Sequence, residues 1–265
     1  ERERVTKNRI VYPNRKDEIG VLSKEIQNMS AGLKLQIQQL EKFSADVSHE
    51  LKNPLTSLQS GMELIEKETI SSENKQKLYK NMLNDIRRMN QLISDISKFT
   101  RLKAEIELEK NQFIDLNLFL DELPSMFANN QKEIELIVNQ CEENIELLGN
   151  KNKLIQVFVN LIENSISLSP KQSKILIEVK KINKKMITIK IYDQGMGIEK
   201  NASEKVFDRF YTDRHENYKN HTGLGLSIAR EIITHMDGKL QLDKSEKSEY
   251  SGACFLIILP VRQSS

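Results

Sequence analysis

The sequence contains few of the residues that mark several common classes of protein. Its 265 residues include no Trp and only two cysteines. Cys141 and Cys254 have neither a CxxC partner nor a histidine at metal-binding spacing, which argues against a disulfide scaffold and against a zinc site. We expect each cysteine to be a lone buried thiol.

Charge and apolar runs argue against two further classes. The 40 basic and 38 acidic residues give a net charge of +2, so the chain lacks the basic field of a nucleic-acid-binding protein, and we expect no nucleic-acid partner. No apolar run approaches the roughly 18 residues of a transmembrane helix, and no signal peptide is visible. The chain begins at Glu1 without a Met, so we expect a fragment whose own N-terminus lies upstream.

Glycine and proline are unevenly distributed, and this separates two regions. From position 17 to about 104 the chain has only three glycines and one proline, and its apolar residues follow helical spacing. The first seam steps by 4, 3 and 4 residues, as in a coiled coil, through Leu22, Ile26, Met29 and Leu33. A further step of four to Ile37 is a stutter, which predicts a junction between helical modules near residues 33–40.

A second apolar helical run extends from Leu78 to Phe99, after a polar turn at about residues 69–74. Two helices joined by a short turn predict an antiparallel hairpin over residues 41–104. Neither helix can bury its stripe against one neighbour alone, so we expect the all-α hairpin to dimerise into a four-helix bundle.

From about residue 111 the pattern changes to strands mixed with helices. The segments 175–179, 187–191 and 255–259 read as strands, the second alternating with period two, and Pro260 should stop the last of them. Residues 153–167 and 225–235 have helical spacing. The sequence predicts an α/β domain of about 150 residues, with a helical layer over one sheet.

His49 lies within the first hairpin helix, in the sequence Ser-His-Glu-Leu-Lys-Asn-Pro. The phase of the seam places its imidazole on the solvent side, with Asn53 one turn later on the same face. Such an imidazole suits nucleophilic attack on phosphorus, with Glu50 taking its proton and Asn53 orienting a water. A surface histidine beside an incidental proline is the alternative.

Three further motifs are weak by themselves. Asn160 and Asn164 lie four residues apart on one helix face, where amide oxygens could complete a Mg²⁺ shell. Asp193-Gln-Gly-Met-Gly follows the alternating strand, where a carboxylate could accept from an adenine amino group; an ordinary turn is the alternative. Gly223-Leu-Gly-Leu-Ser opens a helix, whose first N–H groups suit phosphates.

The order and spacing of these motifs resemble a bacterial two-component sensor histidine kinase. The similarity covers most of the chain, with an H-box at 43–57, an N-box at 153–169, G1 at 193–197, an F-box at 206–211 and G2 at 223–227. Residues 17–33 look like the second helix of a HAMP linker. The resemblance implies a partial HAMP linker and coiled coil (1–40), a HisKA-type dimerisation and phosphotransfer domain (41–104) and an HATPase_c-type ATP-binding domain of Bergerat (GHKL) fold, an α/β sandwich (105–265).

The resemblance also implies roles for individual residues. His49 would accept the γ-phosphate of ATP and pass it to an aspartate of a response regulator receiver domain, with Glu50 as general base and Asn53 positioning the water of a phosphatase reaction. Asn164 and Asn160 would hold Mg²⁺, Asp193 would bind adenine, and a lid would span about 213–222. The remaining ATP-binding positions would be Gly195, Gly197, Phe207, Arg209, Phe210, Tyr211, Arg214, Thr222, Gly223, Leu224, Gly225 and Leu226.

Three positions depart from the family pattern. Ser167 and Thr212 stand where the family often has basic residues, and His221 stands where it often has the first glycine of G2. Arg209 and Arg214 are the candidates for meeting phosphate charge instead. With the sequence around His49 and the Phe-Tyr-Thr-Asp-Arg segment, these departures are similar to the ChvG/ExoS-type sensor kinases.

By this resemblance the chain would be the cytoplasmic portion of a bacterial inner-membrane protein, attached through upstream transmembrane helices and acting as a homodimer. Two alternatives remain open. A hydrolytic ATPase of the same fold would have a Glu four residues before the magnesium Asn, where this chain has Asn160. A non-catalytic dimeric scaffold, or a kinase that acts mainly as a phosphatase, would keep the hairpin.

Overall fold

The computed structural model describes residues 17–66, 71–108, 111–130, 132–212 and 222–261. The chain divides into two units, residues 1–53 and 54–265. Helix α1 (Glu18–Ile65) belongs to the first unit up to Asn53 and to the second from Pro54 onward. No helix within the described ranges combines the length and the apolar character that a membrane crossing requires.

The first unit consists, in its described part, of α1 from Glu18 to Asn53. Asp17 caps its start by accepting a hydrogen bond from the backbone nitrogen of Gly20, at 3.1 Å. The helix continues through residues 33–40, so the predicted junction between two modules lies inside one unbroken helix. The seam is exposed to solvent, with side chains between 44% and 73% accessible at Leu22, Ile26, Met29, Leu33, Ile37 and Leu40.

The predicted hairpin of residues 41–104 falls in both units, and the second unit contains its part from Pro54 to the end of α1 together with helix α2 (Ser72–Leu108). The Ser57 hydroxyl donates to Asp85 at 2.7 Å, and a Cβ at Gly61 would lie 3.2 Å from the side chain of Met82. The turn was expected at about 69–74, but α2 begins at Ser72, because Ser71 accepts a hydrogen bond from the backbone of Asn74 and starts the helix earlier. Residues 67–70 lie outside the described ranges.

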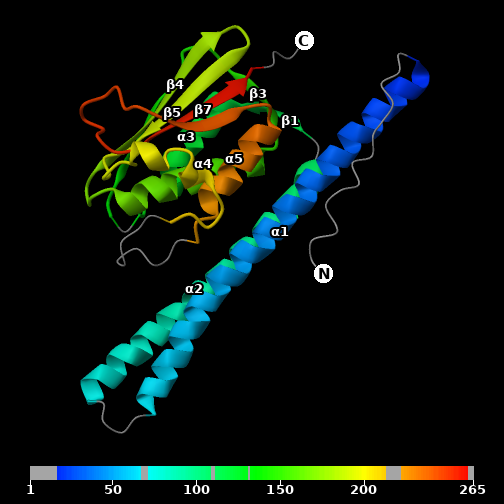
Figure 1. Ribbon diagram of the computed structural model, residues 1–265. Helices are drawn as coiled ribbons and strands as arrows, with labels where there is room; N and C mark the ends of the chain where they lie inside the picture. Colours follow the sequence, from blue (N-terminus) through cyan, green and yellow to red (C-terminus); the bar gives the residue numbers. More distant parts are fainter. Residues whose placement is uncertain (1–16, 67–70, 109–110, 131, 213–221, 262–265) are drawn as a thin grey trace. The chain divides into compact units, whose positions relative to one another are not determined.

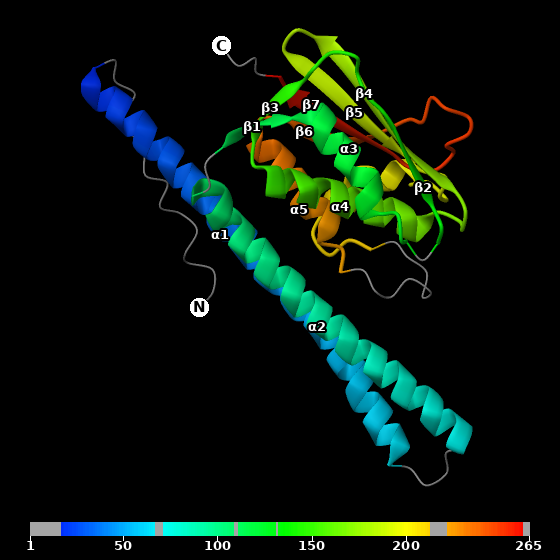
Figure 2. The same cartoon turned by 180° about the vertical axis from the view of Figure 1, so that it is seen from behind.

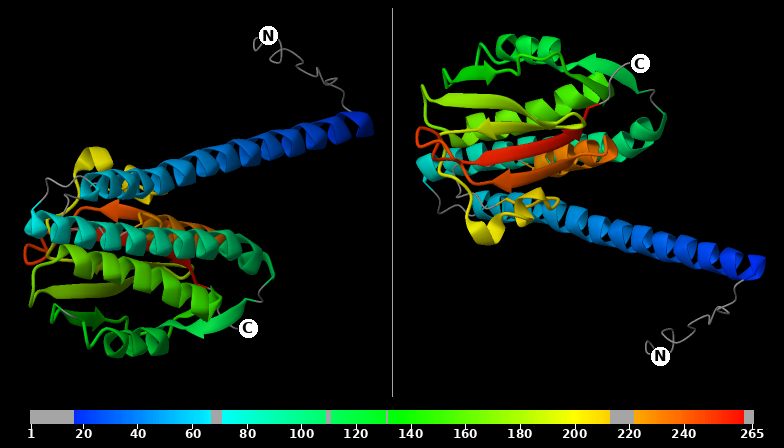
Figure 3. Two further views of the ribbon diagram at one scale, coloured as in Figure 1. Left: turned by 90° about the horizontal axis from the view of Figure 1, so that it is seen from below. Right: turned by 90° about the horizontal axis from the view of Figure 1, so that it is seen from above.

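The sheet domain contains a two-stranded and a five-stranded sheet. β1 (Gln112–Asp115) pairs antiparallel with β3 (Glu146–Gly149). The larger sheet has the order β2-β4-β5-β7-β6, in which only the β2–β4 pair is parallel. Its strands, which Figure 3 distinguishes by colour, are β2 (Glu135–Asn139), β4 (Lys174–Asn183), β5 (Met186–Tyr192), β6 (Lys239–Asp243) and β7 (Cys254–Pro260).

Helices gather on one face of this sheet (Figures 1 and 2). They are α3 (Leu116–Met126), α4 (Lys151–Leu168) and α5 (Gly225–His235). The core lies between the layers, where an apolar row crosses four strands through the register pairs of Val179, Ile189, Ile257 and Leu240. Two short 3₁₀ helices, η1 (Lys200–Ala202) and η2 (Lys205–Phe207), precede the segment before α5.

The predicted fold class is confirmed: a helical hairpin is followed by an α/β sandwich. The predicted strand at 255–259 extends to Pro260, because Pro260 lies beyond the last residue of β7 that pairs with β6 and so leaves that ladder intact. Cys254 is buried, as expected, and burial raises its pKa to about 12. Cys141 is only half-buried, so the expectation of a buried thiol is wrong there, since it lies in the loop after β2 rather than in a strand.

Candidate active site

His49 lies on α1 in the first unit, and its side chain is exposed, as the seam predicts. Asn53, one turn later, is also exposed, and Glu50 is half-buried. Pro54 stands inside the helix and has no N–H to donate, so the carbonyl of Glu50 receives no helical hydrogen bond from it. An accessible imidazole with a neighbouring carboxylate has the composition of an activated nucleophile.

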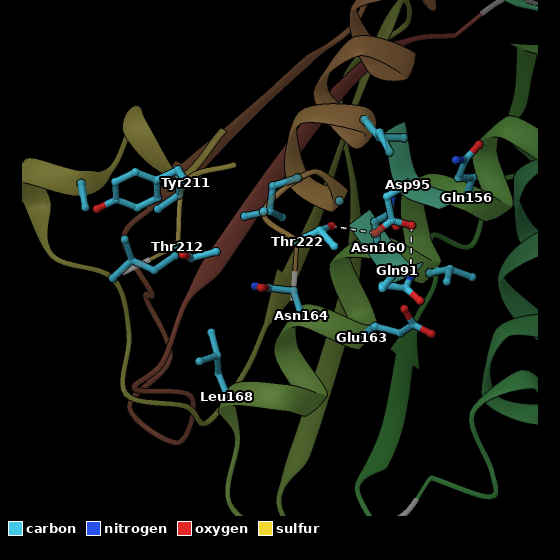
Figure 4. Close-up of a pocket in the computed structure, with 18 of the residues that line it drawn as sticks. Gln91, Asp95, Gln156, Asn160, Glu163, Asn164, Leu168, Tyr211, Thr212 and Thr222 are labelled. Atoms are coloured by element: carbon cyan, nitrogen blue, oxygen red, sulfur yellow. Dashed lines mark hydrogen bonds between the residues drawn. The ribbon is translucent and has the colours of Figure 1, made fainter. Parts of the chain in front are cut away.

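The second unit contains a cavity of about 830 Å³, within the range of small-molecule sites. Figure 4 shows its side chains converging from α4, from the segment around Tyr211 and Thr212, from Thr222 and from α2. The predicted site residues that line it are Asn160, Asn164, Gly197, Tyr211, Thr222, Gly223, Gly225 and Leu226, together with Thr212.

Helix α4 carries the two predicted asparagines on the cavity side. Asn150 caps the helix, its side chain accepting from the backbone nitrogens of Asn152 and Lys153 at 2.9 and 3.1 Å. The Nδ2 of Asn160 is buried and has no hydrogen-bond partner within the described residues. The cavity therefore contains a polar group whose hydrogen-bonding need is met by nothing that the structure describes.

At the other end of α4 the helix carbonyls are capped by a lysine. The Lys132 ammonium donates to the carbonyl oxygens of Ser167 and Ser169 at 2.7 and 2.8 Å. Burial lowers the pKa of Lys132. A positive charge at a helix C-terminus is favourable, so this contact fixes the end of α4, where Leu168 lines the cavity.

Asp193 follows β5 and is almost completely buried, with 1% of its surface exposed. Its Oδ1 accepts two hydrogen bonds, from the backbone nitrogens of Gly195 and Ala253, both at 2.9 Å. Its Oδ2 is buried and has no partner among the described residues. Burial raises the pKa of Asp193, and the backbone N–H groups of Gly195 and Ala253, with the nearby Ser165 side chain, oppose that rise. A carboxylate oxygen in this state is a ready acceptor for an N–H group of a ligand.

The glycines after Asp193 allow the backbone to run close to it. A Cβ at Gly195 would lie 3.0 Å from Asp193 Oδ1 and 3.1 Å from the carbonyl of Leu168. Gly197 has φ +76°, a conformation that favours glycine. Gly197 and Leu168 line the cavity, whereas Asp193 and Gly195 are not among its lining residues.

The predicted F-box residues are placed by packing as well as by the cavity. Phe207 is buried with its ring edge-on to Phe255, at 6.5 Å between centroids. The Arg209 guanidinium lies 4.6 Å from the ring centroid of Phe99 on α2, and Arg209 is not among the cavity-lining residues. Phe210 is buried next to them and Tyr211 faces the cavity.

Gly223 fits against Phe210 because it has no side chain. Its φ is +72°, and a Cβ on it would lie 2.6 Å from the Phe210 carbonyl carbon. The nitrogen of Phe210, itself at φ +61°, donates to the carbonyl of Gly223 at 3.0 Å. Leu224 is buried and its carbonyl accepts from Ile228, so α5 begins at Gly225 beside Asn160.

Helix α2 contributes a wall that the sequence analysis did not anticipate. Thr222, buried beside Gly223, donates its hydroxyl to Asp95 Oδ2 at 2.7 Å across 127 residues of sequence (Figure 4). Gln91 and Lys98 of α2 line the same cavity. No local pattern could have identified them, because their relation to the site arises only from tertiary packing.

Other missed residues do carry a sequence signal. Gln156 and Glu163 line the cavity and share the face of α4 with Asn160, at helical spacing. Among the described residues that line the cavity, Asp95, Glu163 and Glu199 are acidic and Lys98 is basic. A polyphosphate would meet an acidic wall, which a divalent cation could offset.

Part of the predicted site lies outside the described ranges. Arg214 and His221 belong to it, as do residues 213–221 of the lid predicted at about 213–222. His49, Glu50 and Asn53 belong to the first unit, and the cavity belongs to the second. The described residues contain no cluster of three or more His, Cys, Asp or Glu side chains suited to a metal ion.

Two family models match the chain. Residues 39–105 match the "His Kinase A (phospho-acceptor) domain" and residues 149–263 match "Histidine kinase-, DNA gyrase B-, and HSP90-like ATPase". The first range contains His49 and the hairpin, and the second contains α4, α5 and the large sheet apart from β2.

The relatives are sensor proteins. The chain is 34% identical over 266 aligned residues to the sensor protein ChvG of Agrobacterium fabrum, an alignment that covers 96% of this chain and 44% of the relative. ChvG of Rhizobium meliloti is also 34% identical, with 94% of this chain and 45% of the relative covered. The chain therefore spans less than half the length of these relatives, and the expected similarity to ChvG-type kinases is confirmed.

The crystal structure of histidine kinase ThkA in complex with response regulator protein TrrA matches with a TM-score of 0.63 at 22% identity. It covers 92% of this chain and 68% of the matched one, and at this identity it supports the fold alone. An exposed histidine in the phosphoacceptor segment, a cavity in the ATPase segment and the sequence relatives agree with one another. The chain belongs to the two-component sensor histidine kinases.

Proposed function

We propose that this chain transfers the γ-phosphate of ATP to His49 and then to an aspartate of a response regulator. One observation carries the proposal. The same chain holds an exposed imidazole in its phosphoacceptor segment and, in its ATPase segment, a cavity of about 830 Å³ and the buried carboxylate of Asp193, one oxygen of which accepts no hydrogen bond from any described residue. The histidine kinase ThkA, which has a similar fold, forms a complex with a response regulator protein, and this supports a regulator as the partner.

The chemistry is two successive phosphoryl transfers. A nitrogen of the His49 imidazole forms a bond to the γ-phosphorus, and the bond from that phosphorus to the β–γ bridging oxygen breaks, releasing ADP. The Glu50 carboxylate accepts the imidazole proton. In the second transfer a carboxylate oxygen of the regulator forms a bond to the phosphorus, and the phosphorus–nitrogen bond breaks.

The predicted site residues contact different parts of ATP. Asp193 Oδ2 accepts from the adenine amino group, and Gly195 and Gly197 let the base approach the backbone. The start of α5, with Gly223, Leu224, Gly225 and Leu226, directs N–H groups at the phosphates. Phe207 and Phe210 are buried in the segment that brings Tyr211 to the cavity, Thr222 is the last residue of the predicted lid, and Arg209 and Arg214 remain candidates for phosphate contact.

Asn164 and Asn160 fit a magnesium ion, because their amide oxygens are hard donors and the wall around them is acidic. When bound, Mg²⁺ would neutralise charge on the transferring phosphate. The chain's own part is to place the two amides one helical turn apart and to fix both ends of α4 through Asn150 and Lys132.

A phosphatase reaction is part of the proposal. Asn53 is exposed on the same face of α1 as His49, and its amide orients a water for attack on the phosphorylated regulator. This reaction needs the hairpin but not the γ-phosphate of ATP. The balance between kinase and phosphatase activity then depends on whether phosphorylated His49, or the water oriented by Asn53, reaches the regulator.

The domain division at 1–40, 41–104 and 105–265 is also proposed, with support from the matched ranges 39–105 and 149–263. The exposed apolar seams of α1 and α2 support a homodimer. Placement of this chain as the cytoplasmic portion of an inner-membrane protein, with a partial HAMP linker at its start, is proposed from the resemblance to sensor kinases. The ChvG relatives, of which the alignment covers 44–45%, are long enough to contain further segments.

Transfer of label from γ-labelled Mg-ATP to the purified chain tests the proposal. We expect acid-labile, alkali-stable label in the wild type and none in His49→Ala. His235→Ala is the matched control, because His235 is another exposed histidine on a helix of this chain. It should label like the wild type. Label that persists in His49→Ala, or a wild type that binds ATP and stays unlabelled, would contradict the kinase proposal.

A further inference from the structure

We infer that Gln194 and Gly252 are positioning residues that hold the Asp193 carboxylate in the orientation that an adenine amino group requires. The inference rests on the proposed role of Asp193 and adds to it the residues that set selectivity for the 6-amino group. Gly252 comes from the loop between β6 and β7, outside the motifs that the sequence analysis singled out.

Gly252 touches Asp193 so closely that no side chain fits. A Cβ at this position would overlap Asp193 Oδ1 and the backbone nitrogen of Gly195, and it would lie 2.8 Å from the carbonyl oxygen of Asp193. The nitrogen of Gly252 donates to that carbonyl at 3.0 Å. Gly252 has no left-handed φ, so its requirement for glycine comes from this close approach rather than from backbone strain.

Ala253, the next residue, also holds Asp193 through backbone hydrogen bonds. The nitrogen of Ala253 donates to Asp193 Oδ1 at 2.9 Å, and its carbonyl accepts from the Asp193 nitrogen at 3.1 Å. Together with Gly195, this gives one carboxylate oxygen two backbone donors and leaves the other with none among the described residues. Two donors on Oδ1 fix the rotation of the carboxylate, so the direction in which Oδ2 accepts is fixed as well.

Gln194 ties the loop to the sheet beside Asp193. Its Oε1 accepts from the backbone nitrogen of Lys174 at the start of β4, at 2.8 Å. Its Nε2 donates to the carbonyl of Glu249 in the β6–β7 loop, also at 2.8 Å. The side chain thus links two segments on either side of Asp193 and anchors the loop three residues before Gly252.

Contacts made by its own residues also stabilise the β6–β7 loop. Tyr250 is buried, with its ring centroid 6.1 Å from that of Tyr192. The Ser245 hydroxyl donates to the carbonyls of Lys247 and Tyr250. A loop with these contacts forms a rigid support for Gly252 and Ala253, which is the property that a positioning element requires.

The test uses two nucleotides that differ in one group. ATP carries the 6-amino group, and purine riboside triphosphate lacks it. Calorimetric titration of the whole chain with each, in excess Mg²⁺, gives a ratio of dissociation constants. In the wild type we expect ATP to bind about tenfold or more tightly, the usual worth of one hydrogen bond to a charged group.

In Gly252→Ala the ratio should fall to about 1, because the added methyl displaces the carboxylate. In Gln194→Ala it should fall by about threefold or more, with weaker ATP binding and little change for purine riboside triphosphate. Gln194→Ala keeps the inference testable if Gly252→Ala does not fold. Thermal unfolding without nucleotide checks that each variant is folded.

Matched controls separate position from chemistry. Gly32→Ala adds the same methyl at a position with no described atom within 4 Å. Gln140→Ala removes another half-buried Gln, whose amide donates to the Asn117 carbonyl and to Asp121. Both controls should keep the wild-type ratio.

The outcomes distinguish the two levels of proposal. A wild type that binds neither nucleotide, or both equally, would remove the proposed role of Asp193. A wild type that discriminates, with Gln194→Ala and Gly252→Ala discriminating as well, would overturn the positioning roles. Equal weakening of both nucleotides in the variants would also overturn them, because a general structural defect does not act on the 6-amino group.

Discussion

The helices up to residue 108 and the sheet domain that follows differ in how much of their apolar side chains they expose to solvent. On the helices, Leu33, Leu55 and Leu83 are between 51% and 60% exposed. In the sheet domain, Phe158, Ile189 and Ile257 have no exposed surface. Both regions have regular apolar patterns in sequence, of helical spacing in the first and mixed with strand alternation in the second, so regularity alone does not explain the difference. The difference lies in how many faces each element must cover.

Helix α2 shows the reason. One seam of α2 is buried at Leu92, Phe99 and Leu102. A second seam, at heptad spacing, remains exposed through Tyr79, Leu83, Ile86 and Ile93. A sheet with a helical layer closes its core within one chain, whereas a hairpin with two seams per helix leaves the second seam for another chain, as in the proposed homodimer.

The largest effect should come from opening the closed core. Phe158 is fully buried in α4, with its ring edge-on to Phe119. Phe158→Ala should destabilise the sheet domain by about 3–5 kcal/mol through lost burial and the cavity left behind. Denaturant unfolding should give this loss equally at low and high protein concentration. A loss below about 1 kcal/mol would mean that the core is not closed as described.

An intermediate effect is expected at the open seam. Leu83→Glu should weaken the proposed homodimer by about tenfold or more, because a charge placed in a four-helix interface loses its hydration. Sedimentation over a range of concentrations measures this. Ile182→Glu is the matched control, since Ile182 is 55% exposed but lies on the sheet domain, and it should leave the dimer unchanged. If Leu83→Glu and Ile182→Glu gave the same dissociation constant for the homodimer, the hairpin would not form the dimer interface.

The smallest effect concerns a surface ion pair of the sheet. Asp243 accepts from Lys190 at 2.9 Å, and this contact lowers the pKa of the Asp243 carboxyl. Because the folded-state pKa lies below the unfolded value of about 3.9, the stabilisation is complete above that pH and is lost as the pH falls through the folded-state pKa.

Asp243→Asn should therefore lower the free energy of unfolding by up to about 1 kcal/mol at pH 7 and leave it unchanged near pH 2. Unfolding of both forms from pH 2 to 7 measures the difference. The exposed Glu142→Gln serves as control and should change stability by less. A difference that grows toward low pH would contradict the assigned direction.

Much of the site was accessible from local patterns. Asn160 and Asn164 could be placed on one face because helical periodicity is a local property, and the glycine at 223 could be placed before a helix for the same reason. The ends of α4 and β7 differ from expectation by one or two residues, since caps such as Asn150 and a strand edge at Pro260 depend on neighbours.

The sequence by itself determined the family, the two regions and the candidate chemistry, because motif order and the periods of helix and strand are properties of the linear sequence. Tertiary structure alone decided which distant groups meet. It brought Asp95 of α2 to the hydroxyl of Thr222, and it placed Gly252 against Asp193 where no Cβ fits. These contacts depend on packing between segments far apart in sequence, and no local period encodes such distances.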